Sequence, residues 1–395
     1  MLSSYWGFTS FRPGQAEIIE SVVGGTDTLA LLPTGGGKSL CFQVPGLLRG
    51  GVTLVLSPLI SLMHDQVLGL AGRGIAAFAM TGRVDAGLLS NVRSRMSSSN
   101  SFFLYLAPER LNTRQFRWLI QGQRVGLIVV DEAHCISSWG HDFRPAYRTI
   151  QQLRENYGAP FCALTATATR RVERDIVKNL ALRSPRVFRY SFDRPNIHFS
   201  VRQVVDARGE VLSWLDRERG PAIIYDSSRE GVEIWAEKLR RAGISSAAYH
   251  GGLNAGFKDH VQRRWMRKKV RVMVATNAFG MGIDRPDVRL VLHVGLPDSL
   301  ESYYQEAGRA GRDGRPAHAV LLVSPEARKA RMALLRAGSF RQRIRANRLV
   351  RPILRYAERE MCRRWGVLGY FGENIRVPCG NCDVCGRLKR EAPHH

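Results

Sequence analysis

Short apolar runs alternate with longer amphipathic segments through the first half of the chain. The runs lie at residues 29–32, 52–56, 102–106, 127–130 and 161–164, and each is bounded by Gly, Pro, Ser or Asp. Strands alternating with helix-length segments are the rhythm of βαβ units, which build parallel sheets. The pattern therefore predicts an α/β domain with a parallel sheet.

A second series of apolar runs begins after an interruption near residues 193–206. It comprises residues 222–225, 247–249, 270–275, 290–294 and 319–323. Beyond residue 325 the apolar spacing becomes helical, and a stretch rich in Gly and Cys follows. We therefore predict three domains, at 1–194, 195–325 and 326–395: two with parallel sheets and one small and helical.

The charge balance narrows the class of protein. The 395 residues include 59 Lys and Arg against 34 Asp and Glu, a formal net charge of +25. An excess of this size is typical of proteins that bind nucleic acid. A genomic bias toward Arg codons would explain 51 Arg against 8 Lys, but not the shortage of carboxylates. Hydrophobic content of 44% excludes wholesale disorder. Because neither a membrane span nor a signal peptide is evident, we expect a cytoplasmic protein without a membrane partner.

A glycine-rich turn follows the first predicted strand, with the sequence Thr34-Gly35-Gly36-Gly37-Lys38-Ser39. Glycines let backbone N–H groups curl around phosphate oxygens, and the following helix start adds positive potential. Lys38 would reach the β- and γ-phosphates, and Ser39 would offer a hydroxyl to Mg²⁺. A plain glycine turn is the alternative, but the strand–loop–helix context favours phosphate binding.

Two acids, Asp131 and Glu132, follow the apolar run at 127–130. Their place is the carboxyl edge of a parallel sheet, where α/β folds bind ligands. Asp131 would hold the metal, and Glu132 would orient or deprotonate an attacking water. A helix N-cap is the alternative for such a pair taken alone.

Four of the seven cysteines cluster near the end of the chain, at Cys362, Cys379, Cys382 and Cys385. Four thiolates form a closed tetrahedral shell for Zn²⁺, which predicts a structural site. A redox pair of Cys379 and Cys382 is an alternative that leaves the other two unexplained. The remaining cysteines, Cys41, Cys135 and Cys162, are predicted to be buried and inert.

Taken together, these motifs closely resemble the RecQ DNA helicases of helicase superfamily 2, in order from about residue 6 to residue 385. The resemblance implies two RecA-like parallel-sheet domains that hydrolyse ATP between them, followed by a small helical zinc-binding domain. It also implies 3′→5′ movement on single-stranded DNA. The nucleotide-binding residues that it implies are Phe8, Arg12, Gln15, Thr34, Gly35, Gly36, Gly37, Lys38, Ser39 and Asp284. Of these, Phe8, Arg12 and Gln15 would surround the adenine, and Asp284 would bond a ribose hydroxyl.

The resemblance also implies roles for an arginine motif and an aromatic-rich loop. Arg312 would be the arginine finger, and Arg309 would contact phosphate or Glu132, although the reverse assignment stays open. Residues 137–145 match the loop that contacts DNA; its candidate residues are Trp139, His141, Phe143 and Arg144. The two aromatic rings suit stacking on unpaired bases, and Arg144 suits a phosphate. A hydrophobic cluster under a surface loop is the alternative.

One departure and one basic segment affect the expected DNA contacts. The family usually has Asn where Ser227 stands, and rarely an acid at Asp226, so we expect a weaker phosphate contact there. Four arginines near the zinc site would give DNA a basic surface; they are Arg341, Arg343, Arg345 and Arg348. The alternative is that they form only a solvated helix face.

These expectations define an ATP- and Mg²⁺-dependent DNA helicase that acts in DNA repair and recombination. Its partners would be single-stranded DNA and junctions of single and double strands, with a single-stranded-DNA-binding protein as a candidate and a monomer as the expected state. About ten residues follow Cys385, too few for a winged-helix domain, so the chain is a naturally short member or a trimmed one. An alternative is a DNA-stimulated ATPase or translocase with little unwinding. Another is a zinc-containing DNA-binding protein in which ATP only sets affinity.

Overall fold

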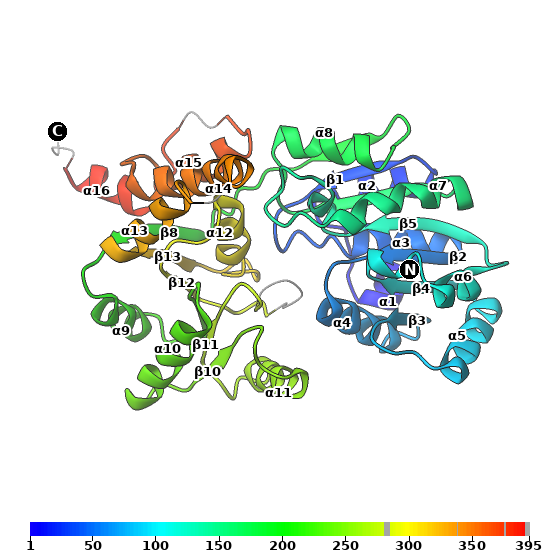
Figure 1. The fold of residues 1–395 in the computed structure, drawn as a ribbon, viewed down its shortest axis with the longest axis horizontal. Helices are drawn as coiled ribbons and strands as arrows, with labels where there is room; N and C mark the ends of the chain where they lie inside the picture. The colour runs from blue at the N-terminus through cyan, green and yellow to red at the C-terminus, as the bar shows by residue number, and fades with distance from the viewer. Residues whose placement is uncertain (280–284, 338, 375–376, 392–395) are drawn as a thin grey trace. The chain divides into compact units, whose positions relative to one another are not determined.

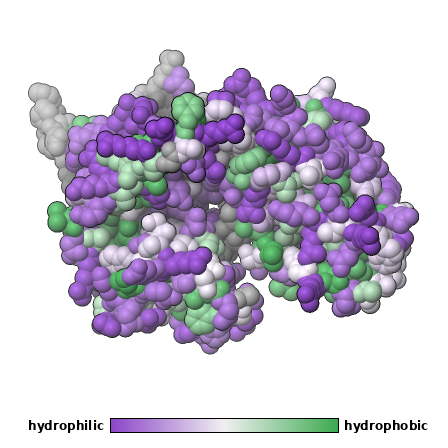
Figure 2. Space-filling view, in the orientation of Figure 1, coloured by the Kyte–Doolittle hydropathy of each residue, from purple (hydrophilic) through white to green (hydrophobic). Residues whose placement is uncertain are grey.

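A computed structural model of the chain describes residues 1–279, 285–337, 339–374 and 377–391. The chain divides into two compact units, Met1–Phe192 and Asp193–His395. Each unit combines a sheet with surrounding helices (Figure 1). No helix among the described residues has the length and apolar character needed to cross a membrane. Hydrophilic residues predominate on the face seen in Figure 2, with hydrophobic ones scattered among them.

Unit 1 is built on a seven-stranded sheet with the order β3-β4-β2-β5-β6-β1-β7, in which all the pairings are parallel. Its strands are β1 (Thr28–Leu31), β2 (Gly51–Leu56), β3 (Ala77–Met80), β4 (Ser101–Leu106), β5 (Val125–Val130), β6 (Phe161–Thr165) and β7 (Arg186–Arg189). The central strands are buried on both faces, as the continuous apolar runs require. Parallel pairing places the residues after β1, β5 and β6 at one edge of the sheet.

The helices of unit 1 connect these strands. They are α1 (Leu2–Trp6), α2 (Gln15–Val23), α3 (Leu40–Arg49), α4 (Ile60–Ala71), α5 (Ala86–Ser98), α6 (Arg114–Ile120), α7 (Gln152–Tyr157) and α8 (Arg170–Asn179), with 3-10 turns η1 (Pro108–Arg110), η2 (Ala133–Ile136) and η3 (Pro145–Gln151). Ile18 and Val22 of α2 and Cys41 of α3 enter the core cluster with the sheet. This packing fixes both ends of the glycine-rich turn.

Unit 2 contains a six-stranded parallel sheet with the order β10-β11-β9-β12-β13-β8. Its strands are β8 (Ile197–Gln203), β9 (Ala222–Tyr225), β10 (Ser246–Tyr249), β11 (Val272–Ala275), β12 (Leu290–Val294) and β13 (Ala317–Val323). Helices α9 (Ala207–Arg217), α10 (Arg229–Arg241), α11 (Ala255–Met266) and α12 (Leu300–Ala307) accompany them. Val211, Val232 and Leu239 bury the inner faces of α9 and α10 against the strands.

The cysteine-rich region of unit 2 lies along the edge strand β8. Its helices are α13 (Pro325–Leu334), α14 (Phe340–Glu358), α15 (Arg363–Tyr370) and α16 (Asp383–Glu391). Phe199 of β8 forms an isolated parallel bridge with Cys382. The backbone N–H of Val201 donates to Asp383 Oδ2 at 3.1 Å, and Arg363 pairs with Asp383 at 3.0 Å. The outer edge of β8 is therefore covered by this region.

The predicted α/β fold with two parallel sheets and a helical C-terminal part is confirmed. All ten predicted strands are present, with ends that shift by at most two residues. Three strands were missed: β3, β7 and β8. Each of these three lies at an edge of its sheet.

Candidate nucleotide, DNA and zinc sites

The glycine-rich turn joins β1 to α3 and begins beside β6. The N–H of Leu32 donates to the carbonyl of Thr165 at 3.1 Å, which anchors the turn to the neighbouring strand end. Gly35 and Gly37 have φ values of +79° and +75°, a region that disfavours residues with a Cβ. A Cβ on Gly37 would also lie 2.4 Å from Gln15 Nε2. Glycine is therefore required at this position for both reasons.

The residues predicted to surround adenine are partly assembled. Gln15 is almost fully buried; its Oε1 accepts from the N–H of Arg12 at 2.9 Å, and its Nε2 donates to the carbonyl of Gly37 at 3.0 Å. Arg12 Nη1 donates to the carbonyl of Gly35 at 2.5 Å. Phe8 remains 51% exposed. Arg12 and Gln15 thus contact the phosphate loop directly, while Phe8 offers an open ring face.

The acid pair lies at the end of β5, on the edge that also carries the phosphate loop. Glu132 adopts a left-handed backbone conformation with φ 48° and ψ 47°. Its N–H donates to Asp131 Oδ1 at 3.0 Å, and its Oε2 lies 3.2 Å from His134 Nδ1. His134 Nδ1 is also 2.9 Å from Thr165 Oγ1. A left-handed backbone at a residue other than glycine is tolerated where the surroundings fix the residue, and here Asp131 and His134 contact it.

The surroundings give the two acids different proton affinities. Burial raises the pKa of Asp131 above its ordinary value, the charge of Glu132 adds to this, and Lys38 offsets part of it. Burial would also raise the pKa of Glu132, but the hydrogen bond and charge of His134 and the charge of Lys38 together lower it. Glu132 is therefore the carboxylate that stays ionised, and Lys38 lies near enough to influence both acids.

The aromatic-rich loop is joined to the acid pair by a ring contact. The imidazole of His141 stacks on that of His134 with ring centroids 4.5 Å apart and an interplanar angle of 15°. Ser137 anchors the start of the loop, because its hydroxyl donates to Asp175 Oδ2 of α8 at 2.6 Å. The loop is thus held between the carboxylate site and α8.

The other predicted DNA residues of this loop are half-buried. The guanidinium of Arg171, on α8, lies over the ring of Trp139, and that of Arg148 lies over Phe143 at 5.2 Å. Arg144 donates to the carbonyl of Pro58 at 2.9 Å and pairs with Asp142 at 3.3 Å. These contacts hold the loop in shape, and they would have to rearrange for the rings to stack on bases.

The arginine motif lies in unit 2, just after α12. Arg309 is only 6% exposed and lies beside Tyr225, whose pKa is raised by burial and lowered in part by that arginine. His293 Nε2 contacts Glu306 Oε2 at 2.8 Å in the same buried group. Arg312 is half-buried. Arg312 is therefore the more accessible of the two arginines within unit 2.

Asp226, which departs from the family pattern, has a local structural role. Its Oδ1 accepts from the N–H of Ser228 at 2.8 Å and from its hydroxyl at 3.0 Å, at the start of α10. A Cβ on Gly231 would lie 2.5 Å from the same oxygen. The carboxylate thus supports the helix start. Asp284, predicted to bond the ribose, lies outside the described residues.

The four clustered cysteines converge as predicted. One sulfur atom from each lies within 4.8 Å of the others; the ligand set is Cys362, Cys379, Cys382 and Cys385. Three are buried, and Cys379 is half-buried. Four sulfurs at such separations fit a tetrahedral Zn²⁺ shell with bonds of about 2.3 Å. The remaining cysteines, at 41, 135 and 162, are buried, and burial raises the pKa of each thiol, as expected of inert groups.

Several residues that contact the predicted site residues in the structure were not predicted from the sequence. No role is predicted for His134 from the sequence, yet it contacts Glu132, Thr165 and His141. Arg171 and Asp175 of α8 hold the aromatic-rich loop from a distant part of the chain. No local pattern predicts such pairings, because each depends on where α8 packs.

Three family models match successive parts of the chain. They describe a DEAD/DEAH box helicase at residues 12–175, a helicase conserved C-terminal domain at 205–314 and a RecQ zinc-binding domain at 328–386. The order is that of the two sheets followed by the cysteine-rich helices. The models thus support both the fold and the zinc site.

Two curated relatives and one solved structure illustrate the similarity. The ATP-dependent DNA helicase RecQ of Pasteurella multocida is 44% identical over 98% of this chain and 61% of its own length. The protein of the same name from Bacillus subtilis is 39% identical, over 98% and 66%. The chain thus spans about two thirds of the length of these relatives. S. cerevisiae Dbp5 bound to RNA and ADP BeF3 shares the fold, with a TM-score of 0.70, 17% identity and coverage of 98% and 95%.

Proposed function

Because this chain belongs to the RecQ family of superfamily 2 helicases, we propose that it is an ATP-dependent helicase that moves 3′→5′ on single-stranded DNA and separates duplexes. The observation that carries the proposal is the group formed by Glu132, His134 and Thr165 at the sheet edge beside the phosphate loop. An ionised acid next to a lysine-bearing glycine loop suits hydrolysis of a nucleoside triphosphate.

In the proposed reaction, water attacks the γ-phosphorus of ATP and the bond to the ADP oxygen breaks. Glu132 orients the water and accepts its proton, and the contact with His134 keeps the carboxylate in place. Lys38 and the N–H groups of the loop stabilise the β- and γ-phosphate charge. Arg312, or Arg309 in the reverse assignment, supplies a further positive charge to the γ-phosphate.

Asp131 and Ser39 are the residues that would hold Mg²⁺. The raised pKa of Asp131 fits this role, because a carboxylate buried beside Glu132 is stabilised in its ionised form by a nearby cation. When bound, Mg²⁺ would neutralise charge on the β- and γ-phosphates. Phe8 and Gln15 would contact the adenine, and the Gln15 amide would exchange its carbonyl partners in the loop for the base.

DNA is the proposed partner, as single strands and as junctions with duplex. The net charge of +25 supports a polyanionic partner, and α14 presents the exposed arginines Arg341, Arg343 and Arg345. The contact of His141 with His134 would let DNA bound at Trp139 and Phe143 act on Glu132. We further propose that the protein is a monomer that acts in DNA repair and recombination. A single-stranded-DNA-binding protein is a candidate partner.

Strand separation and ATP turnover measured in one reaction test this function. The substrates are a 3′-tailed duplex, a 5′-tailed duplex and the matching RNA, with Lys38→Ala as the inactive control. We expect turnover stimulated by DNA, unwinding of the 3′-tailed substrate only, and loss of both in Lys38→Ala with DNA binding retained. Turnover without unwinding would instead support a translocase. Turnover that persists in Lys38→Ala would contradict the site.

A further inference from the structure

We infer that Arg194 is a positioning residue that clamps the backbone of the arginine loop, residues 308–315, which carries Arg309 and Arg312. Its guanidinium donates three hydrogen bonds to that loop, to the carbonyl oxygens of Gly308 at 2.9 Å, Ala310 at 2.9 Å and Gly311 at 3.0 Å. One planar cation thus binds three carbonyls within four residues. The inference rests on the proposed function, in which those arginines act on the γ-phosphate.

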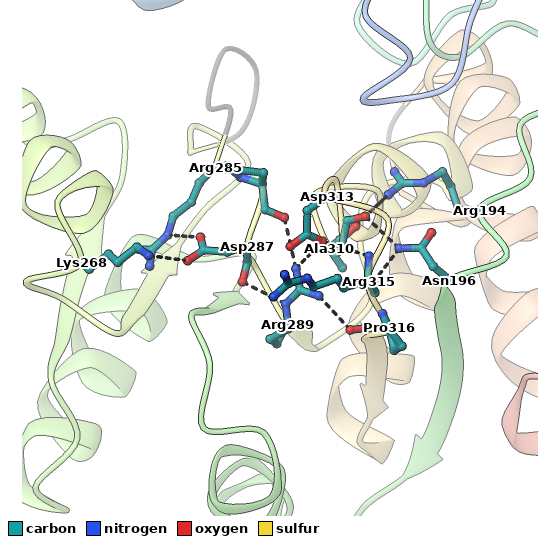
Figure 3. A network of polar contacts seen from close by, with 12 residues as sticks. Arg194, Asn196, Lys268, Arg285, Asp287, Arg289, Ala310, Asp313, Arg315 and Pro316 are labelled. Atoms are coloured by element: carbon teal, nitrogen blue, oxygen red, sulfur yellow. Dashed lines mark hydrogen bonds and ion pairs between the residues drawn. The ribbon is translucent and has the colours of Figure 1, made fainter. Parts of the chain in front are cut away.

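Asn196 reinforces the clamp from the same side of the loop (Figure 3). Its Nδ2 donates to the carbonyl of Gly311 at 2.8 Å and to that of Arg315 at 2.9 Å. Gly311 has a φ of +56°, and a Cβ there would lie 2.4 Å from Asn196 Nδ2 and 2.7 Å from the Arg315 oxygen. The loop backbone is therefore fixed in one conformation with no space for a side chain at residue 311.

Backbone placement matters here because arginine side chains are long. A guanidinium that must meet a phosphate oxygen needs placement to within about 0.5 Å, and a mobile backbone adds its own movement to that of the side chain. Of the clamp carbonyls, that of Gly308 directly precedes Arg309, and those of Ala310 and Gly311 lie between Arg309 and Arg312 in the sequence. Arg194 therefore acts through these two arginines and has no contact with ATP in this scheme.

The cysteine-rich region in turn holds the clamp segment. Arg364 of α15 pairs with Asp193 at 3.0 Å and donates to the carbonyl of Pro195 at 3.1 Å. Asn381, between two zinc-ligand cysteines, donates to the same carbonyl at 3.1 Å. Residues 193–196 thus lie between the arginine loop and the predicted zinc site. We infer that the cysteine-rich region supports the ATPase machinery as well as offering a basic surface.

A simpler explanation is that Arg194 only stabilises unit 2. Arg271 provides a matched comparison, because its guanidinium also donates to three carbonyls of unit 2, those of Leu215, Glu218 and Gly220. None of these carbonyls belongs to the arginine loop. If stability alone mattered, loss of Arg271 and loss of Arg194 would affect the ATPase equally.

The test compares Arg194→Ala, Arg194→Lys and Arg271→Ala in the full, zinc-loaded chain. It measures kcat and KM for ATP, DNA affinity, and hydrogen–deuterium exchange of residues 308–315. For Arg194→Ala we expect kcat at least tenfold lower, KM and DNA affinity within about twofold, and faster exchange in the loop. Arg194→Lys should be intermediate, since an ammonium cannot bind three carbonyls in one plane. Arg271→Ala should change kcat by less than twofold and leave loop exchange unaltered.

The exchange measurement keeps the two proposals apart. If residues 308–315 of Arg194→Ala exchange hydrogen as slowly as those of the wild type, the clamp is overturned, even where the wild-type chain is active. A wild-type chain without DNA-stimulated turnover would overturn the proposed function and the clamp's catalytic role with it. If Arg194→Ala does not fold, Asn196→Ala and Arg194→Lys give the same comparison, and unchanged loop exchange and kcat in both would overturn the clamp.

Discussion

His141 and His134 stack face to face, with ring centroids 4.5 Å apart, so the aromatic-rich loop is one ring away from Glu132. His134 is fully buried, and its Nδ1 contacts both Glu132 Oε2 and Thr165 Oγ1. A shift of the loop on binding DNA would therefore move a ring against the residue that orients Glu132. If DNA binds at this loop, as proposed, the ring contact would give a short physical route from DNA to the proposed hydrolytic acid.

The first prediction concerns this ring contact. His141→Ala should keep the basal ATPase rate within about twofold but lower its stimulation by single-stranded DNA about tenfold, because the ring that contacts His134 is lost. His141→Phe retains a stacking ring and should keep most of the stimulation. Steady-state turnover with and without oligonucleotide measures both. Equal stimulation of the ATPase by DNA in His141→Ala and the wild type would show that the ring contact does not carry the effect of DNA to Glu132.

Asp131 gives a pH-dependent prediction for stability. Its pKa is raised on folding, so the folded protein binds the proton more tightly than the unfolded chain. Stability is therefore lost as the pH rises through the interval between the ordinary and the raised pKa. The substitution Asp131→Asn removes the free-energy cost of ionising the buried carboxylate and keeps the shape of the side chain. We expect its Tm to exceed the wild-type value by about 2–4 °C at pH 8, corresponding to about 1 kcal/mol, and by less at pH 4.

Nucleotide supplies the control for Asp131. ATP with Mg²⁺ should raise the Tm of the wild type more than that of Asp131→Asn, since the variant lacks the carboxylate proposed to hold the metal. With ATP and Mg²⁺, the difference in Tm between Asp131→Asn and the wild type should then become smaller or change sign. A variant that is less stable than the wild type at pH 8 without nucleotide would contradict the assigned cost.

Two glycines of the arginine loop form a matched pair. Gly311 and Gly314 both have positive φ, but only Gly311 lacks space for a Cβ; nothing lies within 4 Å of the position on Gly314. Gly314→Ala should cost only the backbone strain of about 1–2 kcal/mol. Gly311→Ala should also displace the loop and lower kcat for ATP at least tenfold. Turnover and thermal unfolding of both variants check this, and equal kcat values would argue against a rigid loop.

The exposed arginines of α14 give a prediction on salt dependence. Replacing Arg341, Arg343 and Arg345 by Ala should weaken single-stranded DNA binding about tenfold near 0.1 M salt. The slope of log K against log salt should fall by about 2 if all three contact phosphate. The control replaces three exposed arginines on or just after α9, which are Arg208, Arg217 and Arg219. A fluorescence anisotropy titration measures both, and identical slopes would exclude α14 as a DNA surface.

The strands that the sequence pattern missed share a physical feature. β3, β7 and β8 are edge strands, so each pairs with another strand of the sheet on one side only. Arg186 and Arg189 are tolerated in β7, and Ala77 and Ala79 suffice in β3, because an edge has less apolar surface to bury. Interior strands such as β5 are buried throughout and read as continuous apolar runs. Periodicity thus detects the sheet interior better than its edges.

For the candidate site, too, the sequence predicts short motifs but not contacts between residues that are far apart in the chain. The phosphate loop, the acid pair and the four cysteines are short motifs whose spacing indicates their chemistry, and the geometry of each is compatible with it. Arg194 lies more than a hundred residues from the loop that it holds, and no local pattern connects the two. Asp226 shows the opposite case, because an apparent departure from a DNA motif is a helix-start residue with a ready local explanation.

The covering of β8 also has a consequence for solubility. Asp383 and Cys382 occupy the outer side of this strand, and their helix is held in place by the cysteine cluster. Loss of Zn²⁺ would release that helix and leave a seven-residue strand with unpaired backbone groups. Such an edge pairs readily with a second copy. A cysteine cluster filled with Zn²⁺ would therefore keep this edge of the sheet from pairing with a second copy.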